Sequence, residues 1–186
     1  MAARKDISTL SLAILGLLSA EPHSGYDVQK VFDETPMIHY SSSPGAIYPA
    51  LARLERDGLV KGTVEKQESL RPRKVYRLTA SGRRALVSRL RAPVTREDAR
   101  RHMDDLLMRF ALLDGVVGPE AAVRFLEGLR DRCREVVGAL RSYMDEPEDH
   151  LPFGGRLAVL HGVESYQATI DWAEAAIAAY RSAGSA

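Results

Sequence analysis

The chain has 186 residues and a formal net charge of +1, and 45% of its residues are hydrophobic and 27% charged. This composition is that of a globular protein with a buried core, which excludes a disordered chain, and the length suits two small domains. The single cysteine, Cys133, excludes an internal disulfide and a multi-cysteine zinc site, so we expect a cytoplasmic protein.

Charge is distributed unevenly along the chain. Residues 1–95 hold 15 Lys and Arg against 9 Asp and Glu, a net charge of +6, whereas the remainder holds 11 against 16, a net charge of −5. A basic front half and an acidic back half indicate that only the front half meets a polyanion. The alternative interpretation is variation between two solvated surfaces.

The first apolar segment, residues 7–18, follows two basic residues and so imitates a secretory signal peptide. We reject that interpretation because the segment is shorter than the roughly 20 apolar residues that span a bilayer. Its large side chains also recur at the spacing of a soluble amphipathic helix, at Leu10, Ile14, Leu17 and Leu18. We predict a helix from Ser8 to about Ser19, ended by Pro22.

A second helix is predicted to open at Ser24. Asp27 lies three residues further on and completes a capping-box pattern, and Pro36 stops the helix. The apolar face behind the cap consists of Val28, Val31 and Phe32.

The third predicted helix covers residues 43–58, SPGAIYPALARLERDG. Ser43 is the expected N-cap, Pro44 the first helical residue and Gly58 the left-handed C-terminal cap. Pro49 removes an interior backbone donor, so either the first turn is irregular or the helix bends there. The inward face consists of Ile47, Ala50, Leu51 and Leu54.

Two short β segments follow, residues 59–65 and 74–78, joined by a polar, basic link. A fourth helix is predicted from Thr79 to about Leu90. Pro93 then marks the boundary between a first domain, residues 1–92, and a second, residues 93–186.

The second domain is predicted to contain three helices and no strands. The first begins at a capping-box pattern of Thr95 and Asp98 and continues through Leu113, and the second begins at Gly118 and Pro119. The last, residues 156–180, has a heptad stripe of Val159, Val163, Tyr166, Ile170, Ala173, Ile177 and Tyr180.

Three helices followed by a β-hairpin are the elements of a winged helix-turn-helix, in which the third helix enters the DNA major groove. The inward positions leave Gly45, Tyr48, Pro49, Arg53 and Arg56 facing outward. The backbone at Gly45 and the hydroxyls of Ser42 and Ser43 suit a phosphate at the positive end of the helix. Tyr48 is the residue best placed to touch base edges. The wing cations Arg71, Arg73 and Lys74 supply sequence-independent attraction.

Residues 8–82 resemble the DNA-binding domain of the PadR family of bacterial transcriptional regulators. The resemblance rests on SPGAIYPALARLERDGLV at 43–60, HSGYDV at 23–28 and RPRKVYRLTASG at 71–82, in the right order and at the right separation. The three-helix tail resembles the long-tailed branch of that family.

The resemblance implies a fold that is mostly α with a small β-hairpin wing, a tail that forms the dimer, and a repressor that releases DNA on binding a phenolic acid or another small aromatic or drug-like effector. It also places Tyr26 close to the DNA backbone, with a half-buried packing role as the alternative. The complete set of predicted DNA contacts is Tyr26, Ser42, Ser43, Pro44, Gly45, Tyr48, Arg53, Arg71, Arg73 and Lys74.

The last helix supports a homodimer. Trp172 lies about 200 degrees around the helix from Ile170, among small alanines, so a second face needs cover from another chain. The alternative is a helix fully buried in a monomer. The candidate effector pocket consists of Met103, Leu107, Phe110, Tyr166 and Trp172. The alternative is that these side chains only pack in the core.

The predicted function is a ligand-responsive repressor that binds a pseudo-palindromic operator as a homodimer, its two reading helices meeting major grooves about 10 bp apart. The alternative is a winged-helix protein-interaction module. Cys133 lies on an apolar stripe and is interpreted as a core residue rather than a redox sensor. The sequence has no metal-ligand spacing, Gly-rich phosphate loop or nucleophile elbow, so we predict no cofactor, no metal and no enzyme.

Overall fold

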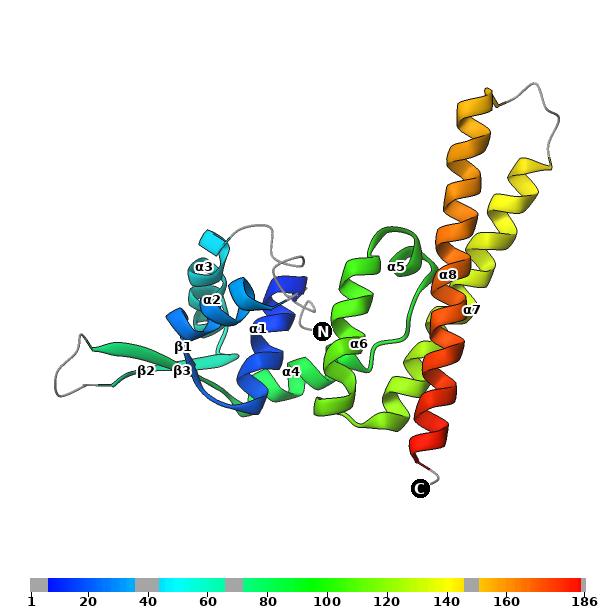
Figure 1. The fold of residues 1–186 in the computed structure, drawn as a ribbon. Helices are drawn as coiled ribbons and strands as arrows, with labels where there is room; N and C mark the ends of the chain where they lie inside the picture. Colours follow the sequence, from blue (N-terminus) through cyan, green and yellow to red (C-terminus); the bar gives the residue numbers. More distant parts are fainter. Residues whose placement is uncertain (1–6, 36–43, 66–71, 146–150, 185–186) are drawn as a thin grey trace, which may run out of the picture. The chain divides into compact units, whose positions relative to one another are not determined.

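The computed structural model describes residues 7–35, 44–65, 72–145 and 151–184 (Figure 1). The chain divides into two compact units, of which the first holds Met1–Ala92 and Leu107–Val117 and the second holds Pro93–Leu106 and Gly118–Ala186. The predicted fold class is confirmed, because helices dominate and the first unit carries a small antiparallel sheet. No helix in these described ranges is long and apolar enough to cross a membrane.

The first unit contains a winged helix-turn-helix. Its elements are α1 (Thr9–Ala20), β1 (His23–Ser24), α2 (Gly25–Glu34), a 3₁₀ turn (Pro44–Ala46), α3 (Ile47–Arg56), β2 (Val60–Glu65), β3 (Arg73–Leu78) and α4 (Ala80–Leu90). The two wing strands pair antiparallel from Val60 opposite Leu78 to Glu65 opposite Arg73. A third strand, β1, was not predicted; it pairs with the other side of β3, so the strand order is β1-β3-β2.

Side-chain caps begin three of these helices, and the one at α2 was predicted. Ser24 and Asp27 form a complete capping box at α2, and Ser8 caps α1. Thr79 caps α4 by accepting a hydrogen bond from the backbone N–H of Gly82. These caps satisfy backbone donors that the first turn of a helix leaves without partners, and each contributes about 1 kcal/mol.

Helix α1 lies at the centre of the first unit. It packs against α3, α4 and β3, and its Leu12, Ile14 and Leu15 are fully buried. Burial of such a side chain contributes about 1.5–3 kcal/mol. At Gly16 a Cβ atom would lie 2.5 Å from Cδ2 of Leu112, so this glycine admits the side chain of a later helix.

That later helix, α6 (Met103–Val116), supplies residues to both units. Besides Leu112, it places Arg109 in the first unit, where the side chain is fully buried and the guanidinium donates a hydrogen bond to the carbonyl of Ala92. Ala92 lies just beyond the end of α4, where a cation suits the negative end of the helix dipole.

The second unit is built on a long antiparallel pair of helices, α7 (Pro119–Met144) and α8 (Phe153–Ala183), which lie side by side in Figure 1. The heptad stripe predicted for α8 faces inward: Val163, Ile170, Ala173 and Ile177 are buried. On α7 the facing stripe includes Leu126, Leu129 and Cys133, all fully buried.

One predicted element is wrong. The helix expected from Thr95 through Leu113 is two helices, α5 (Arg96–Arg101) and α6, because His102 leaves helical geometry at φ −132° and ψ 38°. The charges explain the break. Arg100 and Arg101 occupy the last turn of α5, and Asp104 and Asp105 occupy the first turn of α6. Each pair has the sign that its helix end favours.

Candidate nucleic-acid interface

The start of α3 differs from the prediction. Pro44 begins a 3₁₀ turn, and the α-helix begins at Ile47 with Ala46 as its N-cap and without a side-chain cap bond. Ser43, the expected cap, lies outside the described residues. The later start explains Pro49, which becomes the third α-helical residue, in the first turn where a backbone N–H has no helical acceptor. Of the two alternatives left open, the irregular first turn is therefore correct.

The end of α3 is the predicted glycine cap. Gly58 has φ +72°, and its N–H donates to the carbonyl of Glu55, while the N–H of Leu59 donates to that of Leu54, both at 2.9 Å. These two bonds are the pattern of a Schellman motif. The turn brings the chain directly from α3 into β2.

The two faces of α3 are divided as predicted. Ile47, Ala50, Leu51 and Leu54 are buried, whereas Gly45, Tyr48, Pro49 and Arg53 are exposed. Arg53 makes no ion pair with any residue that the structure describes. Its charge is therefore available to a DNA phosphate.

Tyr48 is 51% exposed, and one edge of its ring lies against the start of α2. A Cβ atom at Gly25 would come within 2.7 Å of Cε1 of Tyr48, so the glycine holds space for the ring. Tyr26, the next residue, is 68% exposed, which favours the predicted position at the surface over the alternative of half-buried packing. The Tyr48 ring of α3 therefore packs against Gly25, the residue of α2 that precedes the exposed Tyr26.

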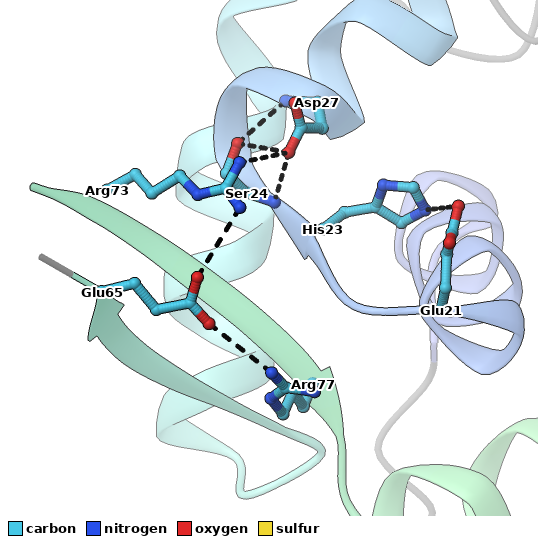
Figure 2. A network of polar contacts seen from close by, with 7 residues as sticks. All are labelled: Glu21, His23, Ser24, Asp27, Glu65, Arg73 and Arg77. Carbon is cyan, nitrogen blue, oxygen red and sulfur yellow. Dashed lines mark hydrogen bonds and ion pairs between the residues drawn. The ribbon is translucent and has the colours of Figure 1, made fainter. Parts of the chain in front are cut away.

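At the start of β3, opposite the end of β2, Arg73 lies between two carboxylates (Figure 2). Its guanidinium is 3.9 Å from Asp27 and 3.6 Å from Glu65, and Glu65 also approaches Arg77 at 3.5 Å. The hydroxyl and backbone N–H of Ser24 donate hydrogen bonds to the same Asp27 carboxylate and hold its pKa below the ordinary value of 3.8. Arg73 therefore ties the wing to the N-terminus of α2.

Lys74, on β3, is bonded to helix α3. Its Nζ donates a hydrogen bond of 2.6 Å to Oε2 of Glu55 on α3, and the backbone N–H of Gly62 on β2 donates to Oε1 of the same carboxylate at 3.2 Å. The ammonium also lies 5.3 Å from the centroid of the Tyr76 ring, within cation–π range. This set of contacts was not predicted, since charge and spacing do not identify a partner 19 residues away in the chain.

Three of the predicted DNA contacts lie outside the described residues. Ser42 and Arg71, like Ser43, lie outside the described residues, and Pro44 is placed only as the start of the 3₁₀ turn. The complete set of predicted DNA contacts stays a prediction.

Two of the five predicted pocket residues line one hollow. A hollow of about 430 Å³ in the second unit is lined by Met103 and Tyr166, together with Ala99, Arg100, Arg101, Asp104, His161, Gly162, Ser165 and Thr169. The Tyr166 hydroxyl donates to the carbonyl of Ala99 at 3.2 Å, and burial raises the pKa of this tyrosine. Leu107, Phe110 and Trp172 do not line it. The polar lining was missed because the prediction considered only large apolar side chains.

Cys133 is fully buried, and burial raises the pKa of its thiol to about 11. This supports the interpretation as a core residue, since the thiol stays protonated at neutral pH. Among the described residues, no group of three or more His, Cys, Asp and Glu is arranged to hold a metal ion.

Comparison with known proteins covers both halves of the chain. Residues 14–88 match the model of the transcriptional regulator PadR-like family, and residues 103–181 match that of the virulence activator alpha C-terminal domain. The chain is 27% identical over 177 residues to the negative transcriptional regulator PadR of Bacillus subtilis (strain 168), covering 91% of this chain and 96% of the relative.

Two further similarities are more limited. Over 55 residues the chain is 49% identical to the transcriptional regulator Rv3488 of Mycobacterium tuberculosis, spanning 28% of this chain and about half, 49%, of that relative. The crystal structure of Bacillus subtilis PadR in complex with operator DNA aligns with 24% identity and a TM-score of 0.43, over 92% of this chain and 98% of that one. With the winged helix and its sequence motifs in place, residues 14–88 of the chain form a domain of the PadR-like family of transcriptional regulators.

Proposed function

We propose that the protein is a sequence-specific DNA-binding repressor that acts as a homodimer on a pseudo-palindromic operator and responds to a small aromatic or drug-like effector. In this proposal residues 1–92 bind DNA, and residues 93–186 form the dimer and hold the effector. The observation that carries it is the outer face of α3, where Tyr48 and Arg53 are exposed and the Tyr48 ring lies against Gly25 at the start of α2. Repression is supported by the 27% identical relative, which is a negative transcriptional regulator.

The outer face of α3 offers few groups for reading bases. Tyr48 is an aromatic ring with one hydroxyl, and Arg53 lies further along the helix, where it suits the phosphate backbone. Direct base contacts from α3 are therefore sparse. We infer that specificity rests largely on DNA shape, on backbone contacts and on the spacing of two half-sites.

The dimer proposal rests on the outer side of α8. Phe153, Leu157 and Leu160 recur at helical spacing and are exposed, and Trp172 is exposed to 38% further along the helix. The alternative of a helix buried within one chain does not fit this exposure. A second copy packed on this side would cover the apolar surface and place two recognition helices symmetrically.

The effector proposal rests on the hollow at Met103 and Tyr166. Its lining combines apolar groups, from Ala99 and Met103, with the hydroxyl groups of Ser165, Thr169 and Tyr166, and with two arginines, Arg100 and Arg101, against one carboxylate, Asp104. Such a site suits a small ring that carries a polar or anionic substituent. By binding one arrangement of the dimer better than another, an effector would shift the population away from the arrangement that fits the operator.

A mobility-shift titration tests the DNA proposal. The probe is a duplex enriched by the protein from a random library, compared with a mixed-sequence duplex at several salt concentrations. We expect tighter binding to the enriched duplex and a steep loss of affinity with salt. Tyr48→Ala should reduce the preference between duplexes, and Arg53→Ala should weaken both and reduce the salt slope by about 1.

Arg124→Ala is the matched control, because Arg124 is an exposed helical arginine in the second unit. A wild-type protein with no preference between the duplexes, or with a flat salt dependence, would contradict DNA recognition and favour the protein-interaction module. Light scattering of the free protein tests the dimer, and a monomer at micromolar concentration would contradict it. Regulation of transcription takes place at the chromosome, so the cytoplasm stays the predicted compartment.

A further inference from the structure

The contacts of Glu55, Gly62 and Lys74 form a unit that we call the wing clamp. Glu55 lies in the last turn of α3, two residues before the cap at Asp57, and its two carboxylate oxygens each accept one hydrogen bond from a different strand of the wing. Gly62 is on β2 and Lys74 is on β3. One side chain of the recognition helix therefore holds both strands of the wing.

Gly62 is fitted to this clamp. It lies inside a strand and its backbone has no positive φ that would favour glycine. A Cβ atom at this position would lie 2.2 Å from Cε of Lys74 and 2.7 Å from Oε1 of Glu55. Glycine weakens a strand interior and often marks a close approach by other atoms. At position 62, the approaching atoms are the charged pair itself.

The clamp lies where the wing could otherwise turn. Between α3 and β2 the chain passes only through Asp57, Gly58 and Leu59, a glycine-capped turn. A rotation of the wing about this turn moves Gly62 and Lys74 together relative to α3. Such a rotation breaks both hydrogen bonds to Glu55, so the clamp opposes it.

We propose that Lys74 is a positioning residue for DNA recognition, which together with Glu55 fixes the angle between the wing and α3, rather than a phosphate contact. The inference rests on the proposed function, since it concerns how this fold meets DNA. Its structural basis is that the ammonium of Lys74 is already bonded to Glu55 and lies over the Tyr76 ring.

Charge makes the two roles distinguishable. Glu55→Gln removes a negative charge near the DNA-binding surface, so electrostatics alone predicts tighter binding to any duplex. The positioning role predicts weaker binding to the enriched duplex, because the clamp is lost. Lys74→Met weakens binding under both roles. The double variant Glu55→Gln/Lys74→Met restores the net charge but not the clamp.

The experiment measures the affinity of the full chain for the enriched duplex and for the mixed-sequence duplex. Since the side chains of Lys74 and Glu55 are 43% and 32% exposed, we expect the enriched duplex to bind about three- to fivefold more weakly in both single variants and in the double variant. Gly62→Ala, which changes no charge, should do the same. The mixed-sequence duplex should bind Glu55→Gln as tightly as the wild type or more tightly.

Lys61→Met is the control, because Lys61 is an exposed lysine on the same strand as Gly62 and makes no ion pair within the described residues. It should weaken both duplexes alike. Circular dichroism melts establish that each variant is folded. The inference is overturned if Glu55→Gln binds the enriched duplex as well as the wild type or better, or if the double variant regains wild-type affinity. Failure of the proposed function looks different, since the wild type itself would then show no preference.

Discussion

Gly82 lies in the first turn of α4, against the backbone that enters the wing. A Cβ atom there would lie 2.0 Å from the carbonyl oxygen of Leu59 and 2.8 Å from Cδ1 of Leu78. The same carbonyl accepts hydrogen bonds from the backbone N–H and the hydroxyl of Thr79, at 3.1 Å and 3.0 Å. Gly82→Ala must therefore push the start of β2 away from α4 and strain both bonds.

The size of the effect follows from opposed contributions. Overpacking costs about 1–3 kcal/mol, and a strained hydrogen bond costs up to about 1 kcal/mol. Alanine in a helix gains about 1 kcal/mol over glycine. We expect the free energy of unfolding to fall by about 2 kcal/mol in Gly82→Ala, with the steric contact outweighing the better helix propensity.

Urea unfolding followed by circular dichroism at one fixed protein concentration measures this difference. Gly138→Ala is the matched control: Gly138 lies inside α7, and a Cβ atom at this position would meet nothing within 4 Å. The control should gain about 0.5–1 kcal/mol. If Gly82→Ala is as stable as the wild type while Gly138→Ala gains stability, the close approach of α4 to the Leu59 carbonyl is refuted.

Three further variants or modifications test other features. Asp27→Asn should destabilise the protein by about 1 kcal/mol near neutral pH, because an amide oxygen accepts the two hydrogen bonds from Ser24 more weakly than a carboxylate and no longer pairs with Arg73. The pKa of Asp27 is lower in the folded than in the unfolded state, so ionised Asp27 stabilises the fold above its unfolded-state pKa. This stabilisation is lost as the pH falls through the folded-state pKa. In urea titrations from about pH 5 to about pH 3, the variant should therefore lose less stability than the wild type. Gly25→Ala should displace the exposed Tyr48 ring and lower the preference for the enriched duplex severalfold in mobility shifts, while changing the urea midpoint little. The Cys133 thiol should resist an aromatic disulfide reagent at about pH 8 in the native protein and react fully in urea, and rapid native labelling would contradict its burial.

Local chemistry made much of the winged helix predictable. Ser24 and Asp27 form the expected capping box, and Gly58 has the expected left-handed conformation. The apolar spacing in α3 gave its inward face correctly. These features depend on residues within one or two turns of each other, so a single sequence contains the whole signal.

The parts that were missed depend on distant partners. Strand β1 has only two residues, and its conformation comes from pairing with β3. Likewise, the charges of Arg73 and Lys74 are visible in the sequence, but their carboxylate partners Asp27 and Glu55 are brought close only by folding. The break at His102 was overlooked because the apolar spacing continues across it, although the reversal from Arg to Asp marks the two helix ends.

Helix α6 limits how this protein can recombine with its relatives. The two family models leave residues 89–102 between them, which is where an exchange of C-terminal segments would be expected to cut. Such a chimera would replace Leu112, which packs against Gly16, and Arg109, which bonds to Ala92 beyond α4. The first unit would then lose part of its own core. A functional chimera must therefore keep residues 107–117 together with the first unit against which they pack. Among relatives, we expect the residues at these positions to vary together with those of α1 and α4, and not with the rest of the second unit.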